Sequence, residues 1–171
     1  MDERRESEAT PTPSKNHTTV ERKSAREVVV TRTVNAPPRI VFEAWTTAEL
    51  FRRWWVPKSY GQTLLACEMD ARVGGQYRLV FPYEDSTMEF FGTYVEVTPH
   101  SRLVWTNDES DNGETITTVT FEEKAGKTLL VVHDVYPSEE AVETGSTGAL
   151  PEALDQLDEL LVSLGSSTET K

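Results

Sequence analysis

Residues that could perform acid–base or metal chemistry are few in this chain. Its three histidines are His17, His100 and His133, and its single cysteine is Cys67. His17 precedes the first apolar run and His100 falls in a predicted turn, so these residues lack the spacing of a metal site. The G-x-S-x-G, HExxH, P-loop and G-x-G-x-x-G motifs do not occur. We therefore predict no catalytic residue, no metal ion and no cofactor.

His133 is the only histidine within a predicted strand. It is either a structural histidine held by hydrogen bonds or a polar contact that orients a ligand. Its neighbour Asp134 points to the opposite face of the strand, so the two residues do not form a catalytic dyad by themselves. Glu68 and Asp70 share one strand face, as acid–base pairs can, but in so acidic a chain we interpret them as solvated.

Aromatic side chains are the clearest indication of function. They fall in segments that would surround a leucine-rich helix at the end of the chain: Trp45, Trp54, Trp55, Tyr77, Phe91, Tyr94, Trp105 and Phe121. Each of these residues either packs in the ordinary hydrophobic core or lines a cavity wall. The first alternative stays open because aromatic side chains are large hydrophobic groups wherever they occur. Trp54 and Trp55 are adjacent at a helix end and cannot both point inward, so we expect one of them at a cavity mouth.

Periodicity predicts the elements that must position these residues. β-branched residues predict a strand over Glu27–Asn35, and apolar residues at helical spacing predict short helices ending near Thr46 and Trp54. Six more strands are expected: Leu64–Ala71, Gln76–Pro82, Met88–Thr98, Arg102–Thr106, Thr115–Glu123 and Thr128–Tyr136. Short connections, such as the Gly74-Gly75 turn, make consecutive strands antiparallel neighbours.

The end of the chain carries the strongest periodic pattern. A leucine stripe with acidic residues on the other faces predicts an amphipathic helix: Leu150, Leu154, Leu157, Leu161 and Leu164. A helix that starts at Ser138 would contain Gly145, Gly148 and Pro151, so we expect a kink or break near Pro151. We hypothesise that the segment before this break swings as a gate.

Composition limits the kinds of binding partner and the cellular location that we expect for the protein. The 171 residues include 29 Asp+Glu and 17 Lys+Arg, a net charge of -12, which disfavours nucleic acid and anionic membranes as partners. No apolar run approaches the ~20 residues of a membrane span, and residues 1–25 lack the apolar core of a signal peptide. A single cysteine excludes an intramolecular disulfide, and we expect Cys67 to be buried in a reducing, cytoplasmic protein.

The distribution of charge separates a tail from a domain. Met1–Ala25 carries five acidic and five basic residues and few apolar ones, so it cannot bury enough surface to offset its ordering entropy. We predict a disordered tail over residues 1–25, one domain over residues 26–165 and a flexible C-terminus over residues 166–171. The expected class is α+β, in the order one strand, two short helices, six strands and a long helix. A sheet that curves around one helix leaves room for a small ligand.

Four segments resemble those of one family, in the same order. They are FEAWTTAELFRRWW from Phe42, EMDARVGGQYR from Glu68, FFGTYVEVTPHSRLVWT from Phe90 and HDVYPSEEA from His133. Together they resemble the START-like (SRPBCC, helix-grip) superfamily, in the branch named after the C-terminal domain of the activator of heat-shock protein 90 ATPase. The resemblance implies a curved antiparallel sheet of about seven strands that grips the C-terminal helix, with two small helices closing one end. Thr144–Pro151 departs from the uninterrupted helix that the family implies.

Arg32 interrupts an otherwise apolar strand face, where a buried charge needs a partner. In the fold that the resemblance implies, the first and last strands are neighbours, which makes Asp134 a candidate partner. The alternative is an arginine at the rim of the sheet, whose stem packs while its head reaches water.

The resemblance also implies candidate functions, because many relatives hold lipids, sterols or polyketides in a cavity and a few cavities are catalytic. Our leading hypothesis is binding of a small hydrophobic ligand between sheet and helix, in a monomer or weak homodimer with no nucleic-acid or membrane partner. His133 and Tyr94 would orient the ligand. The alternatives are a chaperone-cofactor or stress-response module acting on the heat-shock protein 90 ATPase, and a cavity-based hydrolase or cyclase. The candidate cavity residues are Trp54, Trp55, Met69, Tyr77, Leu79, Phe91, Tyr94, Trp105, Val119, Phe121, His133, Leu150, Leu154 and Leu157.

Overall fold

A single curved antiparallel sheet forms the body of the protein. The computed structural model describes residues 18–61, 63–108, 113–144 and 149–169. In this part of the chain the strand order is β1-β2-β8-β7-β6-β5-β4-β3, with every neighbouring pair antiparallel. The strands are β1 (Thr18–Ser24), β2 (Glu27–Val34), β3 (Ala66–Met69), β4 (Gln76–Tyr83), β5 (Ser86–Thr98), β6 (Arg102–Asn107), β7 (Thr115–Lys124) and β8 (Lys127–Val135).

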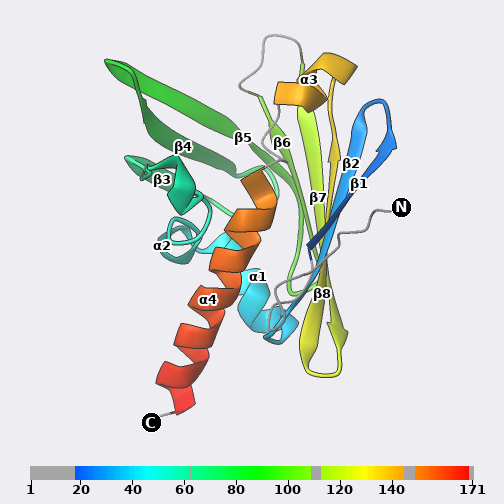
Figure 1. The fold of residues 1–171 in the computed structure, drawn as a ribbon, viewed down its shortest axis with the longest axis vertical. Helices are drawn as coiled ribbons and strands as arrows, with labels where there is room; N and C mark the ends of the chain where they lie inside the picture. Colours follow the sequence, from blue (N-terminus) through cyan, green and yellow to red (C-terminus); the bar gives the residue numbers. More distant parts are fainter. Residues whose placement is uncertain (1–17, 62, 109–112, 145–148, 170–171) are drawn as a thin grey trace, which may run out of the picture.

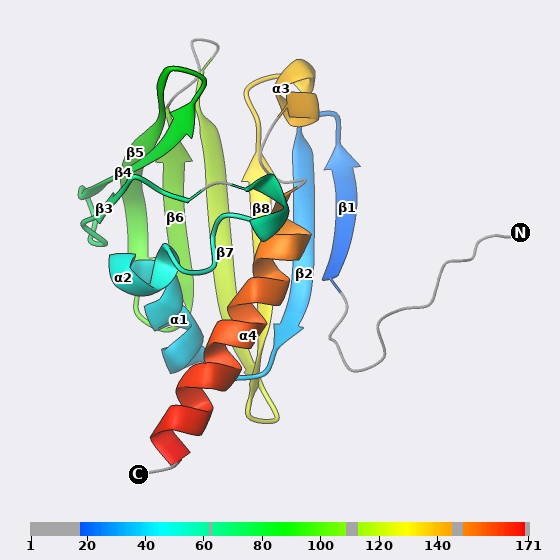
Figure 2. The same cartoon turned by 60° about the vertical axis from the view of Figure 1, so that its left-hand side comes forward.

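Helices lie on one face of this sheet, apart from a short one, residues 139–144, at its upper end. The long C-terminal helix α4 (Leu150–Glu169) crosses that face obliquely, while β4 and β5 lean away from β7 and β8 at the upper end (Figures 1 and 2). The other helices are α1 (Pro38–Thr46), α2 (Ala48–Phe51), the 3-10 turn η2 (Lys58–Tyr60) and α3 (Glu139–Thr144). No helix in the described residues is long and apolar enough to cross a membrane. The α+β class and the curved sheet around a C-terminal helix are therefore as predicted.

The first strand, β1, was not expected. Thr18–Ser24 lies within the predicted disordered tail, yet it pairs with β2 along its length. Its side chains after Thr18 are exposed, so the strand is an edge strand held by backbone hydrogen bonds and needs no apolar pattern. The sheet consequently has eight strands where about seven were predicted. Residues 1–17 lie outside the described part of the chain.

Two helices are described toward the end of the chain, and the break expected near Pro151 falls largely on residues 145–148, outside the described part. Helix α3 ends at Thr144 and α4 begins at Leu150, so Pro151 occupies the first turn, where the missing N–H costs no hydrogen bond. Helix α4 continues to Glu169, into the segment expected to be a flexible C-terminus. The hypothetical gate falls mainly on residues 145–148, which lie outside the described residues.

A closed core lies between the middle of α4 and the sheet. Inward-facing residues alternate along β2, β7 and β8, as the period of two in a strand requires. We define the closed core by five side chains that are fully buried: Val30, Trp54, Val119, Leu154 and Leu157. The Trp54 indole N–H donates to the carbonyl oxygen of Ala44 at 3.0 Å, which ties the segment after α2 to α1.

Candidate functional site

A cavity of about 320 Å³ lies beside the closed core, where β4 and β5 lean away from the rest of the sheet. Its walls come from β3 to β8, from the segment between α2 and η2, and from the first turn of α4. Most of its lining is apolar: Phe51, Val56, Pro57, Phe81, Met88, Phe90, Val132, Ala149 and Ala153 are among the residues that sequence reasoning did not select. Ala153 on α4 and Ala149 just before this helix are small, and a larger side chain at either position would extend into the cavity.

The predicted site residues divide between this cavity and other places. Those that line it are Trp55, Met69, Tyr77, Leu79, Tyr94, Trp105 and Leu150. Trp54, Val119, Leu154 and Leu157 belong instead to the closed core, and Phe121 is buried with them. Of the tryptophan pair, Trp54 is fully buried, while Trp55 is half-buried and lines the cavity.

Phe91 and His133 lie away from the cavity. Phe91 is 44% exposed because it is an odd number of positions from the inward-facing Tyr94, and alternate residues of a strand face opposite ways. For the same reason His133 faces outward between Val132 and Asp134. Its Nε2 lies 3.4 Å from Glu27 Oε1, so it fits the structural interpretation and does not orient a ligand in the cavity.

Sequence reasoning missed a polar group at one end of the cavity. Asn107, Thr115, Thr117 and Asp134 all line it, and the strand register pairs Asn107 with Thr115 and Thr117 with Asp134. Asp134 is only 6% exposed, and its Oδ1 accepts a hydrogen bond of 2.6 Å from Thr117 Oγ1. The alternation along β8 could have identified Asp134, because it shares a face with Val132.

The aromatic wall on β4–β6 depends on a glycine. The Tyr77 hydroxyl donates to the carbonyl oxygen of Thr106 at 2.8 Å, and Tyr77 packs edge-on against Tyr94 and Trp105. A Cβ on Gly92 would lie 1.8 Å from that carbonyl oxygen and 3.0 Å from the Tyr77 ring. Only glycine therefore lets the Tyr77 ring lie across β5.

Tyr94 contributes a neutral hydroxyl to the same wall. Burial, and then the neighbouring Cys67 and Asp70, raise the pKa of Tyr94 well above its ordinary value. Burial likewise raises the pKa of the Cys67 thiol above its ordinary value. Both groups therefore stay protonated at neutral pH, so Tyr94 presents an uncharged hydroxyl in this wall.

Polar residues on α4 hold the segment that covers the cavity. The Gln156 side-chain amide donates to the carbonyl oxygens of Trp54 and Val56 at 2.9 Å each, and its Oε1 accepts from the Lys58 backbone N–H at 2.8 Å. One turn earlier, Glu152 accepts from the Ser59 hydroxyl at 2.6 Å. These bonds fix the segment that carries Trp55, Val56 and Pro57.

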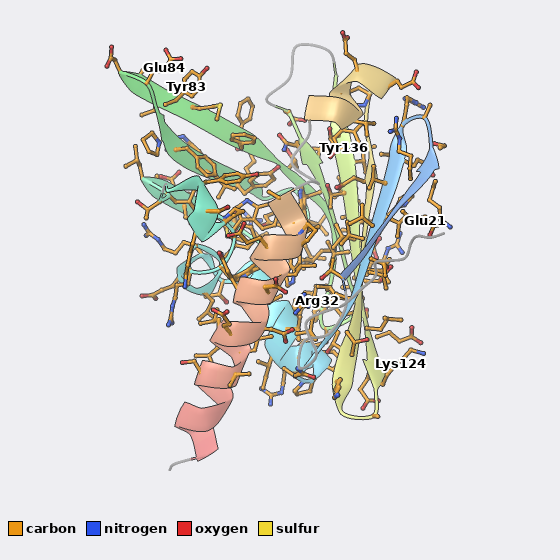
Figure 3. All side chains as sticks on the ribbon, in the orientation of Figure 1. Glu21, Arg32, Tyr83, Glu84, Lys124 and Tyr136 are labelled. Carbon is orange, nitrogen blue, oxygen red and sulfur yellow. The ribbon has the colours of Figure 1, made fainter. Side chains whose placement is uncertain are left out.

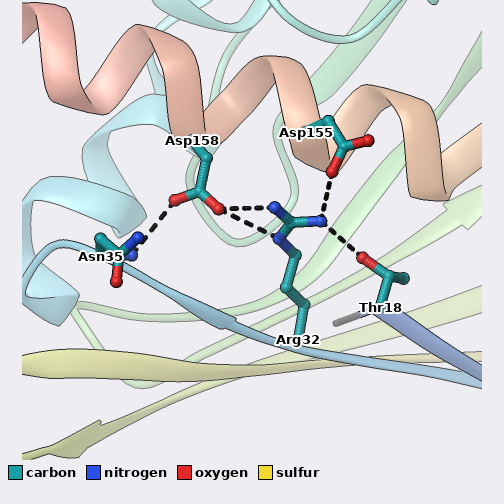
Figure 4. A network of polar contacts seen from close by, with 5 residues as sticks. All are labelled: Thr18, Arg32, Asn35, Asp155 and Asp158. Atoms are coloured by element: carbon teal, nitrogen blue, oxygen red, sulfur yellow. Dashed lines mark hydrogen bonds and ion pairs between the residues drawn. The ribbon is translucent and has the colours of Figure 1, made fainter. Parts of the chain in front are cut away.

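An ionic cluster holds α4 to the other side of the sheet. Arg32 is 1% exposed and lies between β2 and α4 (Figures 3 and 4). It donates to Asp158 Oδ2 at 2.7 and 3.1 Å, to Asp155 Oδ1 at 2.6 Å and to Thr18 Oγ1 at 2.7 Å. Asp158 also accepts from the Asn35 backbone N–H at 3.2 Å.

Both interpretations of Arg32 were therefore wrong. Its cross-strand neighbour is Leu130, whereas Asp134 pairs with Val28 four positions away, so the last strand cannot supply the counter-charge. The charged partners, Asp155 and Asp158, come from α4, and Thr18 of β1 adds a hydroxyl. Among the described residues, no three His, Cys, Asp or Glu side chains are grouped closely enough to hold a metal ion.

Comparison with solved structures gives the same fold. A crystal structure of a protein from Rhodobacter sphaeroides matches with a TM-score of 0.77 at 24% identity, over 86% of this chain and 99% of that one. A Nitrosomonas europaea protein matches with a TM-score of 0.73 at 21% identity, over 84% and 99% of the two chains. A Chromobacterium violaceum protein matches with a TM-score of 0.67 at 26% identity, over 78% and 96%.

Comparison of the sequence with family models identifies the family, whereas the solved structures show only the fold. No curated protein matches this chain. Residues 35–162, which run from the end of β2 to the exposed part of α4, match the model of one family. Strands β3 to β8 and the four segments that suggested the START-like superfamily fall within this range, whereas β1 and β2 precede it. The chain thus belongs to the family described as activator of Hsp90 ATPase homolog 1-like protein.

Proposed function

We propose that this protein binds a small hydrophobic molecule in the cavity between the sheet and the first turn of α4. The observation that carries the proposal is the cavity of about 320 Å³ with mainly apolar walls. Cavities that bind small molecules span roughly 300–1,000 Å³, so this one suits a compact ligand of one or two rings better than a long-chain lipid. Removal of apolar ligand surface from water supplies the affinity.

The main alternative is a module that acts through its surface, and an exposed apolar patch at Trp54 and Trp55 is the feature that would favour it. Trp54 is fully buried and hydrogen-bonded, and Trp55 is half-buried against the cavity. This arrangement supports an internal site over a tryptophan surface.

A cavity-filling variant tests the proposal. 1-Methylnaphthalene serves as a neutral two-ring probe, and its binding is measured by isothermal titration calorimetry. In Ala153→Leu the added side chain enters the cavity from α4, and in Val132→Phe it enters from β8. Val162→Leu is the matched control, because Val162 is 57% exposed on the same helix.

We expect the wild type and Val162→Leu to bind the probe equally, and both cavity-filling variants to lose at least 90% of the affinity, in line with a lost burial of about 1.4 kcal/mol or more. Thermal unfolding shows which variants remain folded. Unchanged binding in folded Ala153→Leu and Val132→Phe would place the probe elsewhere and reject the proposal.

A further inference from the structure

We infer that the hydroxyl of Tyr94 donates a hydrogen bond to the ligand, so that the cavity selects a compact, mainly apolar molecule with a neutral acceptor such as a ketone carbonyl. The inference rests on the proposed function, because it names the class of molecule that the same cavity takes. Tyr94 lies on β5, lines the cavity and is only 2% exposed.

The Tyr94 hydroxyl makes no hydrogen bond to any residue that the structure describes. The side chain is held instead by ring packing against Tyr77 and Trp105. The Tyr77 hydroxyl differs, because it already donates to the carbonyl oxygen of Thr106. A buried hydroxyl without a partner costs free energy, and a ligand that supplies the partner recovers it.

The Tyr94 hydroxyl also borders the open space of the cavity. In the described part of the chain, the unpaired side-chain polar atoms that are closed off from open space are Trp45 Nε1 and Asp108 Oδ1. The Tyr94 hydroxyl is unpaired but is not closed off in this way, and the open space that Tyr94 lines is the cavity. Trp45 lines the same cavity, but a ligand reaches the hydroxyl of Tyr94 and not the indole N–H of Trp45.

The hydroxyl is suited to donate. Burial raises the pKa of Tyr94, so the phenol keeps its proton at neutral pH. This proton has no acceptor among the described residues, whereas the phenol oxygen is a weak acceptor because one of its lone pairs is delocalised into the ring. The ligand group that matches Tyr94 is therefore an acceptor.

The rest of the lining favours a neutral acceptor over an anion. Among the described residues, no Lys, Arg or His lines the cavity. An anionic group that leaves water needs a counter-charge or several hydrogen bonds, and the one proton of Tyr94 does not replace them. A carbonyl group has a smaller hydration cost, so a single hydrogen bond offsets more of it.

The neighbours of Tyr94 favour a ring next to the acceptor. The rings of Tyr77 and Trp105 lie 5.9 and 6.4 Å from that of Tyr94, edge-on, and both line the cavity. Aromatic side chains offer large apolar contact to a flat ring. An aromatic ketone therefore combines the two features that this wall recognises.

Tyr94→Phe tests the inference, because it removes the hydroxyl and keeps the ring. The probes are 1-acetylnaphthalene and 1-ethylnaphthalene, which differ by a carbonyl in place of a methylene group, and isothermal titration calorimetry measures both. We expect Tyr94→Phe to weaken binding of the ketone about three- to tenfold and to leave binding of the hydrocarbon within about twofold. Tyr83→Phe is the matched control, because Tyr83 is 50% exposed and lies outside the cavity lining.

The outcomes separate this inference from the proposed function. If neither probe binds the wild type, the proposed function fails. If the hydrocarbon binds and the ketone does not, or if Tyr94→Phe fails to weaken the ketone more than the hydrocarbon, only the present inference fails. A third probe, 1-naphthoate, carries a carboxylate in place of the acetyl group. Tighter binding of 1-naphthoate than of the ketone would overturn the choice of a neutral acceptor.

A second measurement on the wild type keeps the test decisive if Tyr94→Phe does not fold. A hydrogen bond to a ketone oxygen moves the ¹³C resonance of the carbonyl carbon downfield. We therefore expect 1-acetylnaphthalene labelled with ¹³C at this carbon to resonate downfield, when bound, of its position in hexane. In folded Tyr94→Phe the resonance should return toward the hexane position, and in Tyr83→Phe it should not. A bound resonance at the hexane position in the wild type overturns the inference.

Discussion

The closed core and the cavity lie side by side against the same helix, yet only one of them is filled. In the closed core, Leu154 and Leu157 of α4 are fully buried together with Trp54 and Val119. One turn earlier, Leu150 and Ala153 border open space. The leucine stripe is continuous across both regions, so helix periodicity does not determine where the interior is filled. The difference comes from alanine on α4 and from the outward lean of β4 and β5.

The polar contacts of α4 differ between the two sides in the same way. Toward β2 the helix is held by charges, with Arg32 and Asp158 almost completely buried. Toward the segment over the cavity it is held by a neutral amide, Gln156, and by an exposed hydrogen bond from the Ser59 hydroxyl to Glu152. Buried charges are destabilising when one partner is lost, whereas neutral hydrogen bonds cost less. Removal of one partner should therefore cost more on the β2 side of the helix than on the side over the cavity.

The largest expected effect concerns the ionic cluster. Arg32→Met leaves Asp158 buried without its counter-charge, and we expect a loss of about 3–5 kcal/mol in the free energy of unfolding. Urea denaturation measures this loss. The additional replacement Asp158→Leu should restore most of the stability, since it removes the unpaired charge.

Asp155 provides the control for this experiment. Its side chain is 49% exposed, against 7% for Asp158, so Asp155→Asn should cost about 0–1 kcal/mol and Asp158→Asn considerably more. Equal losses for the two aspartates would contradict the assignment of Asp158 as the buried anchor.

Leucine truncation measures the difference in packing directly. Leu157→Ala in the closed core should cost about 3–5 kcal/mol, and Leu150→Ala at the cavity about 1–2 kcal/mol, because a side chain beside open space has fewer contacts to lose. Urea denaturation of both variants provides the comparison. A loss for Leu150→Ala as large as that for Leu157→Ala would mean that the two regions are equally filled.

A further stability effect concerns the Gln156 clamp, the three hydrogen bonds between this side chain and the segment that covers the cavity. Gln156→Leu keeps the volume but removes three hydrogen bonds to the backbone at Trp54, Val56 and Lys58, and we expect a loss of about 1–3 kcal/mol. Amide hydrogen exchange should accelerate over the segment from Trp54 to Tyr60 and remain unchanged in β2 and β8. Faster exchange spread over the whole sheet would show that the clamp holds the entire fold and not this segment.

Local sequence patterns were sufficient to predict the fold, but they predicted only part of the cavity lining. Period-two alternation predicted most strands, and the leucine stripe predicted helix α4. The same alternation, applied strictly, would also have predicted that Phe91 faces outward and Asp134 faces inward. Strand β1 has no such pattern, since an edge strand is held by its backbone. The partners of Arg32 could not be inferred from neighbouring strands, because they lie on a helix more than 120 residues later in the chain.

The central claim is that the closed core is filled while the cavity admits a small apolar ligand. The most direct test is NMR of protein with ¹³C-labelled Leu and Met methyl groups, saturated with 1-methylnaphthalene. The account predicts nuclear Overhauser effects from the probe to the methyl groups of Met69, Leu79 and Leu150, and none to those of Leu154 and Leu157. Contacts to Leu154 and Leu157, or contacts confined to exposed methyl groups, would contradict it.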